Sequence, residues 1–194
     1  MSLPPQDIQD GVVRLVVSAG LMGVLEIVDR ASLPVSAERI EKTFGQAYVQ
    51  GAPLNLRVLE GALNVVQALP GVNASAALKA GTAPNSTDVV ATVEQTPALD
   101  GSSSLDNWGH ARTGSERASV NLNWNNPSAH GDQLAGNLMA TTAVDYGRLA
   151  YSVPAGFSGS RLGLSYSNMR YRLLGGVNDP VVSGVARTNG VDWS

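Results

Sequence analysis

The stretch from Ala118 to Trp124 alternates strictly between apolar and polar residues. Its apolar positions are Ala118, Val120, Leu122 and Trp124, and the residues between them are serine and asparagine. A period of two is the pattern of a β-strand that has one face in an apolar environment and the other in water. An antiparallel sheet on a soluble core and a membrane β-barrel both produce it. The uncharged polar face and the terminal tryptophan favour the barrel.

The same alternation recurs towards the C-terminus. Turn-rich segments separate the repeats, and one of these predicted turns is Val144 to Tyr146. The predicted strands are Gln133–Thr142, Gly147–Pro154, Arg161–Ser167 and Gly184–Trp193. Aromatic residues near the strand ends fit either a membrane-interface girdle or half-buried rings in a soluble sheet. The low aromatic content, 5%, counts against a membrane barrel.

Composition excludes several classes of protein. The chain has 194 residues, a net charge of -3 and 43% hydrophobic residues, which is unlike a disordered tail or a basic nucleic-acid binder. Because there is no cysteine, disulfides, thiolate metal sites and a cysteine nucleophile are excluded. From the slightly negative net charge we expect no nucleic-acid partner.

The first half predicts a small α+β unit with the order β-α-α-β-β. We expect strands over Val12–Val17 and Val24–Val28, which are rich in β-branched residues. Ser36 offers an N-cap for a short helix over Ala37–Phe44, and Gly45 is the expected end of that helix.

The second helix gives the clearest signal of this half. Asn55 can cap it, Pro70-Gly71 can end it, and its apolar residues follow helical spacing at Leu59, Ala62, Leu63 and Val66. Strands over Val72–Leu78 and Asp88–Val93 are predicted to complete the small sheet.

Three groups of residues follow one another in a fixed order. The first group is Pro53-Leu-Asn-Leu56, Leu59-Glu60 and Ala68-Leu-Pro-Gly-Val72. The second comprises Leu105, Asp106, Asn107, Gly109, Thr113, Gly114, Arg117, Asn126, Pro127, Gly131 and Asp132. The third is Tyr151-Ser-Val-Pro154, Gly159 and Tyr166-Ser167. In this order and spacing the chain, from about Gln6 to Trp193, resembles the two-partner secretion transporters of Gram-negative bacteria, the haemolysin-activator and filamentous-haemagglutinin secretion proteins.

This resemblance implies a fold and a location. Residues 1–96 would form a periplasmic polypeptide-transport-associated (POTRA) domain, the second of the two POTRA domains in these transporters. Residues 97–194 would form the first strands of a sixteen-stranded barrel in the outer membrane, in contact with its lipid. The second group of residues would be the motif at the start of the barrel. The family's later strands and its Val-Arg-Gly-aromatic loop are absent from this sequence, so we expect the chain to be a fragment that conducts no current alone.

The resemblance also implies a function without catalysis or cofactor. Such transporters pass a β-helical exoprotein outward, and their POTRA domains recognise its N-terminal secretion domain. Capture by β-augmentation would add an extended segment to an exposed sheet edge. The candidate edge comprises Val72, Asn73, Ala74, Ser75, Ala76, Ala77 and Leu78, and Leu59 and Leu63 of the neighbouring helix are the candidate groove wall. Proline at Ser75 and at Ala77 is expected to weaken such binding.

Other interpretations remain open at this level. Asp106 and Arg117 could pair across neighbouring strands of a barrel lumen, or Asp106 could form a local turn while Arg117 is solvated. His110 and His130 lack the further ligands that a metal site needs, so loop positions without a metal are expected. Alternative functions are a barrel-assembly factor of the same Omp85 superfamily and a soluble structural or adhesive β-protein; a hydrolase that depends on a histidine is more remote.

Overall fold

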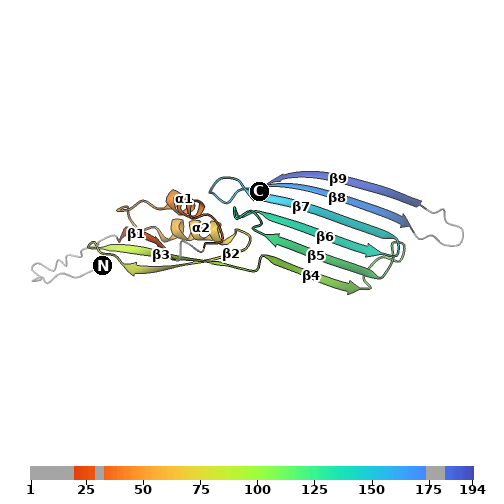
Figure 1. Cartoon of the computed structure of the whole chain (residues 1–194), viewed down its shortest axis with the longest axis horizontal. Helices are drawn as coiled ribbons and strands as arrows, with labels where there is room; N and C mark the ends of the chain where they lie inside the picture. Colours follow the sequence, from red (N-terminus) through yellow and green to blue (C-terminus); the bar gives the residue numbers. More distant parts are fainter. Residues whose placement is uncertain (1–19, 29–32, 174–181) are drawn as a thin grey trace, which may run out of the picture.

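The computed structural model describes residues 20–28, 33–173 and 182–194, and it contains two β-sheets joined end to end (Figure 1). A three-stranded sheet carries both helices, and a six-stranded sheet follows it. The elements in chain order are β1 (Leu21–Ile27), α1 (Ala37–Ala47), α2 (Leu56–Gln67), β2 (Val72–Ala80), β3 (Ser86–Gln95), β4 (Leu99–Asp106), β5 (Arg117–Asn125), β6 (Gln133–Thr141), β7 (Val144–Pro154), β8 (Arg161–Leu173) and β9 (Val182–Trp193). The predicted fold class, an α+β unit followed by an antiparallel meander, is confirmed.

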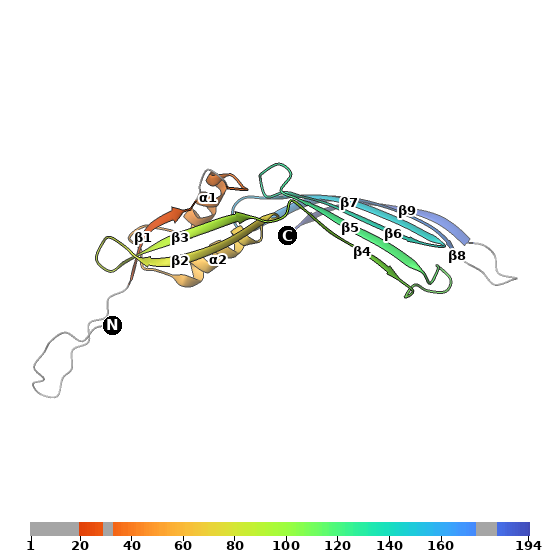
Figure 2. The same ribbon diagram turned by 60° about the horizontal axis from the view of Figure 1, so that its bottom comes forward.

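The small sheet has the strand order β1-β3-β2, with β1 parallel and β2 antiparallel to β3. A parallel pair needs a long crossover connection, and α1 and α2 lie in that crossover. Both helices lie on one face of the sheet (Figure 2). The predicted strand over Val12–Val17 lies outside the described residues.

The hydrophobic core lies between the helices and the small sheet. Ile40 and Phe44, four residues apart on α1, are both fully buried, and Val66 of α2 is fully buried beside them. Burying each such side chain stabilises the fold by about 1.5–3 kcal/mol. Asn55 caps α2 as predicted, because its side chain accepts a hydrogen bond from the Val58 amide. The predicted end of the first helix at Gly45 is wrong: α1 continues to Ala47, since the burial of Phe44 outweighs the modest cost of a glycine inside a helix.

The six-stranded sheet is an antiparallel meander in the order β4-β5-β6-β7-β8-β9. Its first strand, β4, was not predicted, because its Gly- and Ser-rich sequence lacks an apolar alternation. The predicted turn at Val144–Tyr146 is wrong, because these residues begin β7 and pair with both β6 and β8. β8 also extends to Leu173, beyond the predicted end at Ser167.

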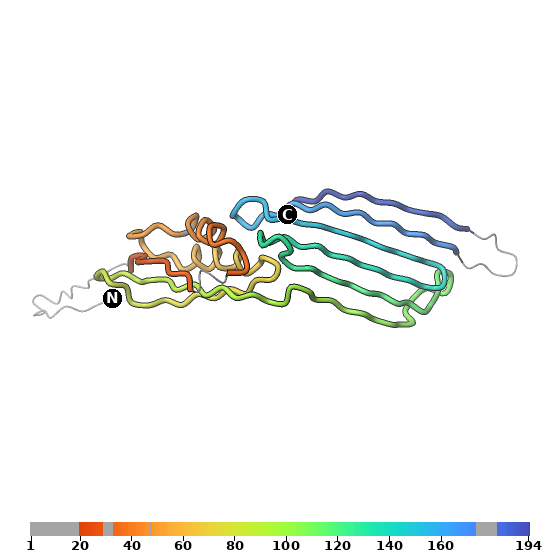
Figure 3. Tube along the Cα trace, viewed as in Figure 1, coloured from red at the N-terminus to blue at the C-terminus, as the bar shows by residue number. Residues whose placement is uncertain are grey.

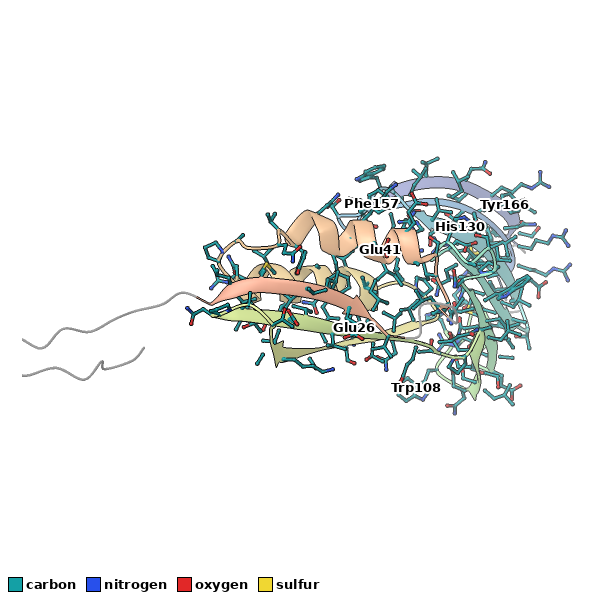
Figure 4. The ribbon with its side chains drawn as sticks, turned by 60° about the vertical axis from the view of Figure 1, so that its left-hand side comes forward. Glu26, Glu41, Trp108, His130, Phe157 and Tyr166 are labelled. Carbon is teal, nitrogen blue, oxygen red and sulfur yellow. The ribbon has the colours of Figure 1, made fainter. Side chains whose placement is uncertain are left out.

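The six-stranded sheet is curved, and its two faces differ in chemistry. Paired residues share a face, so the register assigns each side chain to one side. One row across the sheet is Leu99, Trp124, Leu134, Tyr151, Leu164 and Val191, and the next is Gly101, Leu122, Gly136, Leu149, Tyr166 and Asn189. Figure 4 shows Tyr166 on the convex side, so this largely apolar face is the convex one. Within the described ranges, neither helix is long and apolar enough to cross a membrane.

Candidate functional site

Among the described residues, β2 pairs only with β3 and forms an edge of the small sheet. The Gly71 carbonyl accepts a hydrogen bond from Thr96, and the Gly81 amide donates to Ser86, so odd-numbered residues direct their backbone groups towards β3. Even-numbered residues, including Ala76 and Leu78, therefore present theirs to the free edge. The amides of Ser75 and Ala77 belong to the β2–β3 ladder, so proline there would disturb the sheet itself, and an even-numbered position is the more specific test of the edge.

The helix beside this edge offers less surface than the sequence predicted. Leu59 is packed into the core and is only 5% exposed, because α2 turns it towards the sheet. Leu63 is only partly buried and packs at the margin of the core. Leu78 is 46% exposed at the far end of β2. The free backbone groups of β2, rather than a deep groove, are thus the main feature here.

Asp106 and Arg117 pair across neighbouring strands, as the first interpretation predicted, and Asp106 also forms the local turn of the second; the solvated Arg117 of that second interpretation is wrong. The Arg117 guanidinium donates from Nε and Nη2 to Asp106 Oδ2, at 3.2 and 3.0 Å, across the β4–β5 pair. The other oxygen, Oδ1, accepts a hydrogen bond from the Trp108 amide at 3.1 Å, which is an Asx-type turn. A single carboxylate therefore joins two strands and begins the loop that follows β4 at Asn107.

The glycines of this motif are required by close backbone approach. A side chain at Gly109 would collide with the Gly114 carbonyl, and the Gly109 amide donates to Ser115. Gly114 has φ 96°, a conformation that favours glycine. These residues shape the β4–β5 connection and are distant from the second half of the motif, which lies at the opposite end of β5.

That second half forms the β5–β6 turn, next to the helices (Figure 3). Asn126 has φ 57°, accepts a hydrogen bond from the Gly131 amide and donates from Nδ2 to the Pro34 carbonyl at 2.6 Å. Pro127 follows it at the start of the turn. Gly131 has φ 80° and lies against Leu69, so the turn is fitted to the end of α2. The motif thus connects the two sheets.

Asp132 is the buried acid of this junction, with no exposed surface. Tyr151 donates to its Oδ2 at 2.7 Å, and the Ser128 amide donates to its Oδ1 at 3.1 Å. Burial by itself would raise the pKa of Asp132, but the hydrogen bonds from Tyr151 and Ser128 outweigh it, so the pKa lies below its ordinary value. The carboxylate therefore holds the turn together in its charged form.

A second contact joins α1 to the β7–β8 turn. Arg39 donates to the Gly156 carbonyl at 2.8 Å, and its guanidinium lies 5.3 Å from the centre of the Phe157 ring. Lys42 approaches the same ring at 5.4 Å. Arg161, the first residue of β8, donates to the Gly131 carbonyl at 3.1 Å and to Ser152. These hydrogen bonds connect the β7–β8 turn to the β5–β6 turn. Figure 4 shows Phe157 on the same side as α1.

Sequence reasoning selected only part of this junction. Asp132 was selected only as a motif residue, and Arg39, Phe157 and Arg161 were not selected. The available signal was an aromatic residue inside a short Gly-rich turn, Ala155 to Gly159, where turn propensity does not call for one. A loop aromatic at such a position indicates a packing partner elsewhere in the chain.

The concave face of the six-stranded sheet carries a ladder of polar side chains. Asn137 donates to Asn121 at 2.8 Å, Asn123 donates to Asp100 at 2.8 Å, and Gln133 donates to Asn125 at 2.8 Å. Further members are Ser102, Ser104 and Ser119. Hydrogen bonds between side chains thus cross β4, β5 and β6 on this face.

The two histidines lie in loops, as predicted. His110 accepts a hydrogen bond from the Arg112 amide at 3.2 Å, and His130 lies in the β5–β6 turn beside Ser128. No cluster of three or more His, Asp or Glu side chains suitable for a metal occurs in the part of the chain that the structure describes.

The sequence of this chain is similar to proteins of one known family. The family model "Haemolysin secretion/activation protein ShlB/FhaC/HecB" matches residues 85–194. The heme/hemopexin transporter protein HuxB of Haemophilus influenzae is 24% identical over 191 residues, covering 97% of this chain and 33% of that protein. The chain thus spans about a third of the length of this relative.

Two solved structures share the fold. CdiB from Escherichia coli superposes with a TM-score of 0.67 at 21% identity, covering 98% of this chain and 36% of that one. CdiB from Acinetobacter baumannii gives a TM-score of 0.64 at 18% identity, covering 90% and 34%. The likeness extends over both sheets and both helices.

Proposed function

Because the chain belongs to the haemolysin secretion/activation protein family, two-partner secretion transporters of the Omp85 superfamily in Gram-negative outer membranes, we propose that it recognises a secreted partner protein and forms part of its export channel. Residues 1–96 are assigned to a periplasmic POTRA domain and residues 97–194 to the first strands of the barrel. The family exports a secreted protein and is not a family of enzymes. We propose that the partner is a β-helical exoprotein recognised through its N-terminal secretion domain.

The observation that carries this proposal is the inverted amphipathicity of the six-stranded sheet. On its convex face Leu138 is 62% exposed, Leu149 56% and Leu164 56%, with no protein layer over them among the described residues. A soluble sheet hides such a face, whereas a barrel wall presents it to hydrocarbon. The concave face, with its amide and hydroxyl ladder, suits a water-filled lumen.

The edge of β2 supports the recognition step. Its even-numbered residues present free backbone donors and acceptors, and an extended segment can add to them as a further antiparallel or parallel strand. The outer face of this strand is polar or small at Asn73, Ser75 and Ala77, so it does not obstruct an incoming chain.

A backbone-specific substitution tests this step. Leu78→Pro removes an edge amide, and Leu78→Ala removes the side chain while keeping that amide, so the two form a matched pair. We expect the full gene product with Leu78→Pro to bind the N-terminal segment of the exoprotein about tenfold more weakly, the equivalent of one or two lost hydrogen bonds, with Leu78→Ala near the wild type. Equal affinities of the two variants, measured by calorimetry, would contradict recognition at this edge.

The alternative functions are less well supported. A soluble adhesive protein does not account for the exposed leucines of the convex face. A barrel-assembly factor shares the architecture, but the family match favours secretion of a partner.

A further inference from the structure

The convex face contains a hollow where two glycines face outward from adjacent strands. Gly136 of β6 and Gly147 of β7 leave space between large apolar neighbours, and a Cβ at Gly136 would meet no atom within 4 Å. The hollow has a volume of about 380 Å³. Its lining on this face comprises Val120, Leu122, Leu138, Leu149, Tyr166 and Asn168. A hydrocarbon chain fits such a surface.

One polar atom in this hollow has no partner. Asn168 Oδ1 is buried and makes no hydrogen bond within the described part of the chain. A buried polar atom without a partner is costly and is usually satisfied by a water molecule or a ligand. Asn168 lies at the rim of this otherwise apolar hollow, where the face changes its chemistry.

The outward face changes from apolar to cationic at Asn168. On β8 the convex residues are Leu162, Leu164 and Tyr166, and beyond Asn168 they are Arg170 and Arg172. Arg187 of β9 is the direct register partner of Asn168, so it lies beside the rim. Arg170, Arg172 and Arg187 are all exposed. Asp145 of β7 is the register partner of Arg170 on the same face, but no carboxylate of the described residues lies within ion-pair distance of the three arginines.

From this arrangement we propose that the hollow and the arginines form one lipid site, which binds an acyl chain in the hollow and the headgroup phosphate of the same lipid on Arg170 and Arg187. The order of surfaces along β8, apolar, then amide, then cationic, matches the order of groups in a phospholipid. Guanidinium groups bind phosphate through paired, charge-assisted hydrogen bonds. The inference rests on the proposed function, which places the convex face in the membrane. It adds a phospholipid whose phosphate is bound by Arg170 and Arg187.

Three probes separate the parts of this site. Phosphatidic acid carries the acyl chains and the phosphate, diacylglycerol carries the same chains alone, and inorganic phosphate carries no chain. Bound lipid is counted by native mass spectrometry on the full gene product in detergent micelles, with the exoprotein absent. We expect phosphatidic acid to bind about tenfold more tightly than diacylglycerol, and inorganic phosphate not to displace it at equal concentration.

Variants identify the residues responsible. The double substitution Arg170→Gln and Arg187→Gln is expected to lower the affinity for phosphatidic acid about tenfold and to leave diacylglycerol unchanged. A Cβ at Gly136 meets no atom within 4 Å, so Gly136→Leu is expected to occupy the hollow and to weaken both lipids. Arg112→Gln, at an exposed arginine of the β4–β5 connection, is the matched control for loss of positive charge and should have no effect.

Specific outcomes overturn the proposal. Equal binding of phosphatidic acid and diacylglycerol, equal weakening by Arg112→Gln, or displacement by inorganic phosphate at equal concentration would each exclude a site for both parts of a lipid. Leu78→Pro, which tests recognition of the exoprotein, is expected to leave lipid binding unchanged. Failure of the lipid site therefore leaves exoprotein recognition standing, and the reverse also holds.

Discussion

The hydroxyl of Tyr151 donates a 2.7 Å hydrogen bond to the buried carboxylate of Asp132, and this contact joins β7 to the β5–β6 turn. Tyr151 begins on the apolar convex face, but its polar end reaches the junction with the small sheet. One aromatic side chain thus serves both the barrel wall and the link to the helices.

Removal of this hydroxyl is expected to weaken the junction. Tyr151→Phe leaves the buried Asp132 carboxylate short of one donor, which costs about 1–3 kcal/mol. The measurement is the free energy of unfolding in detergent by urea titration. Tyr166→Phe is the control, because Tyr166 lies on the convex face and no described residue is hydrogen-bonded to its hydroxyl. An equal effect of the two substitutions would contradict the assigned role of the Tyr151 hydroxyl.

Stability is expected to depend on pH through Asp132. The pKa of this carboxyl is lower in the folded protein than in the unfolded chain, so the unfolded state binds the proton more readily. The charged group therefore stabilises the fold above the unfolded pKa of about 4, and this contribution is lost as the pH falls through the folded value. Urea midpoints measured at a series of pH values, from about two units above the unfolded pKa to about two units below it, should show the decline. Asp132→Asn should flatten that decline; an unchanged profile in this variant would assign the pH dependence to other groups.

The contact between α1 and Phe157 is expected to contribute a measurable coupling energy. Each cation above the ring contributes about 0.5–1 kcal/mol at an exposed site. A double-mutant cycle with Arg39→Ala and Phe157→Ala isolates the pair, and unfolding free energies supply the four corners. A second cycle that combines Arg39→Ala with Trp108→Ala is the control, since Trp108 is exposed in the β4–β5 connection. A coupling energy near zero would mean that Phe157 and Arg39 act independently.

Two glycines with similar backbone angles should respond differently to alanine. Gly131 has φ 80° and its added Cβ would lie 2.8 Å from Leu69, whereas Gly156 has φ 77° and open space. Gly156→Ala reports backbone strain alone, about 1–2 kcal/mol, and Gly131→Ala adds the collision with Leu69. Unfolding free energies of the two variants, compared directly, give the cost of that collision. Equal losses would show that the β5–β6 turn moves freely away from α2.

Local sequence patterns predicted most of the elements correctly. The side-chain oxygen of Asn55 and the apolar spacing from Leu59 to Val66 are sufficient to define α2, because capping and helical period act within one turn. The alternation of Ala118 to Trp124 likewise defined β5. β4 was missed because its pairing with β5, rather than its own composition, makes it a strand.

The candidate site was harder to predict than the fold. The pairing of Asp106 with Arg117 was one of two alternatives, and the β4–β5 register decided it, whereas the turn from Asp106 to Trp108 is local. The lipid site could not be predicted, because Gly136, Asn168 and Arg187 lie on three different strands and meet only through pairing.

The sequence by itself determined the two kinds of unit, since helical period and strand alternation arise from the geometry of a single segment and need no partner. It also determined which face of β5 is apolar. Tertiary structure alone decided how the units meet: the Asp132–Tyr151 hydrogen bond, the Phe157 contact and the fit of Gly131 on Leu69 all join residues that are far apart in the chain. The physical reason is that such contacts depend on register and on the approach of separate elements, which no local pattern encodes.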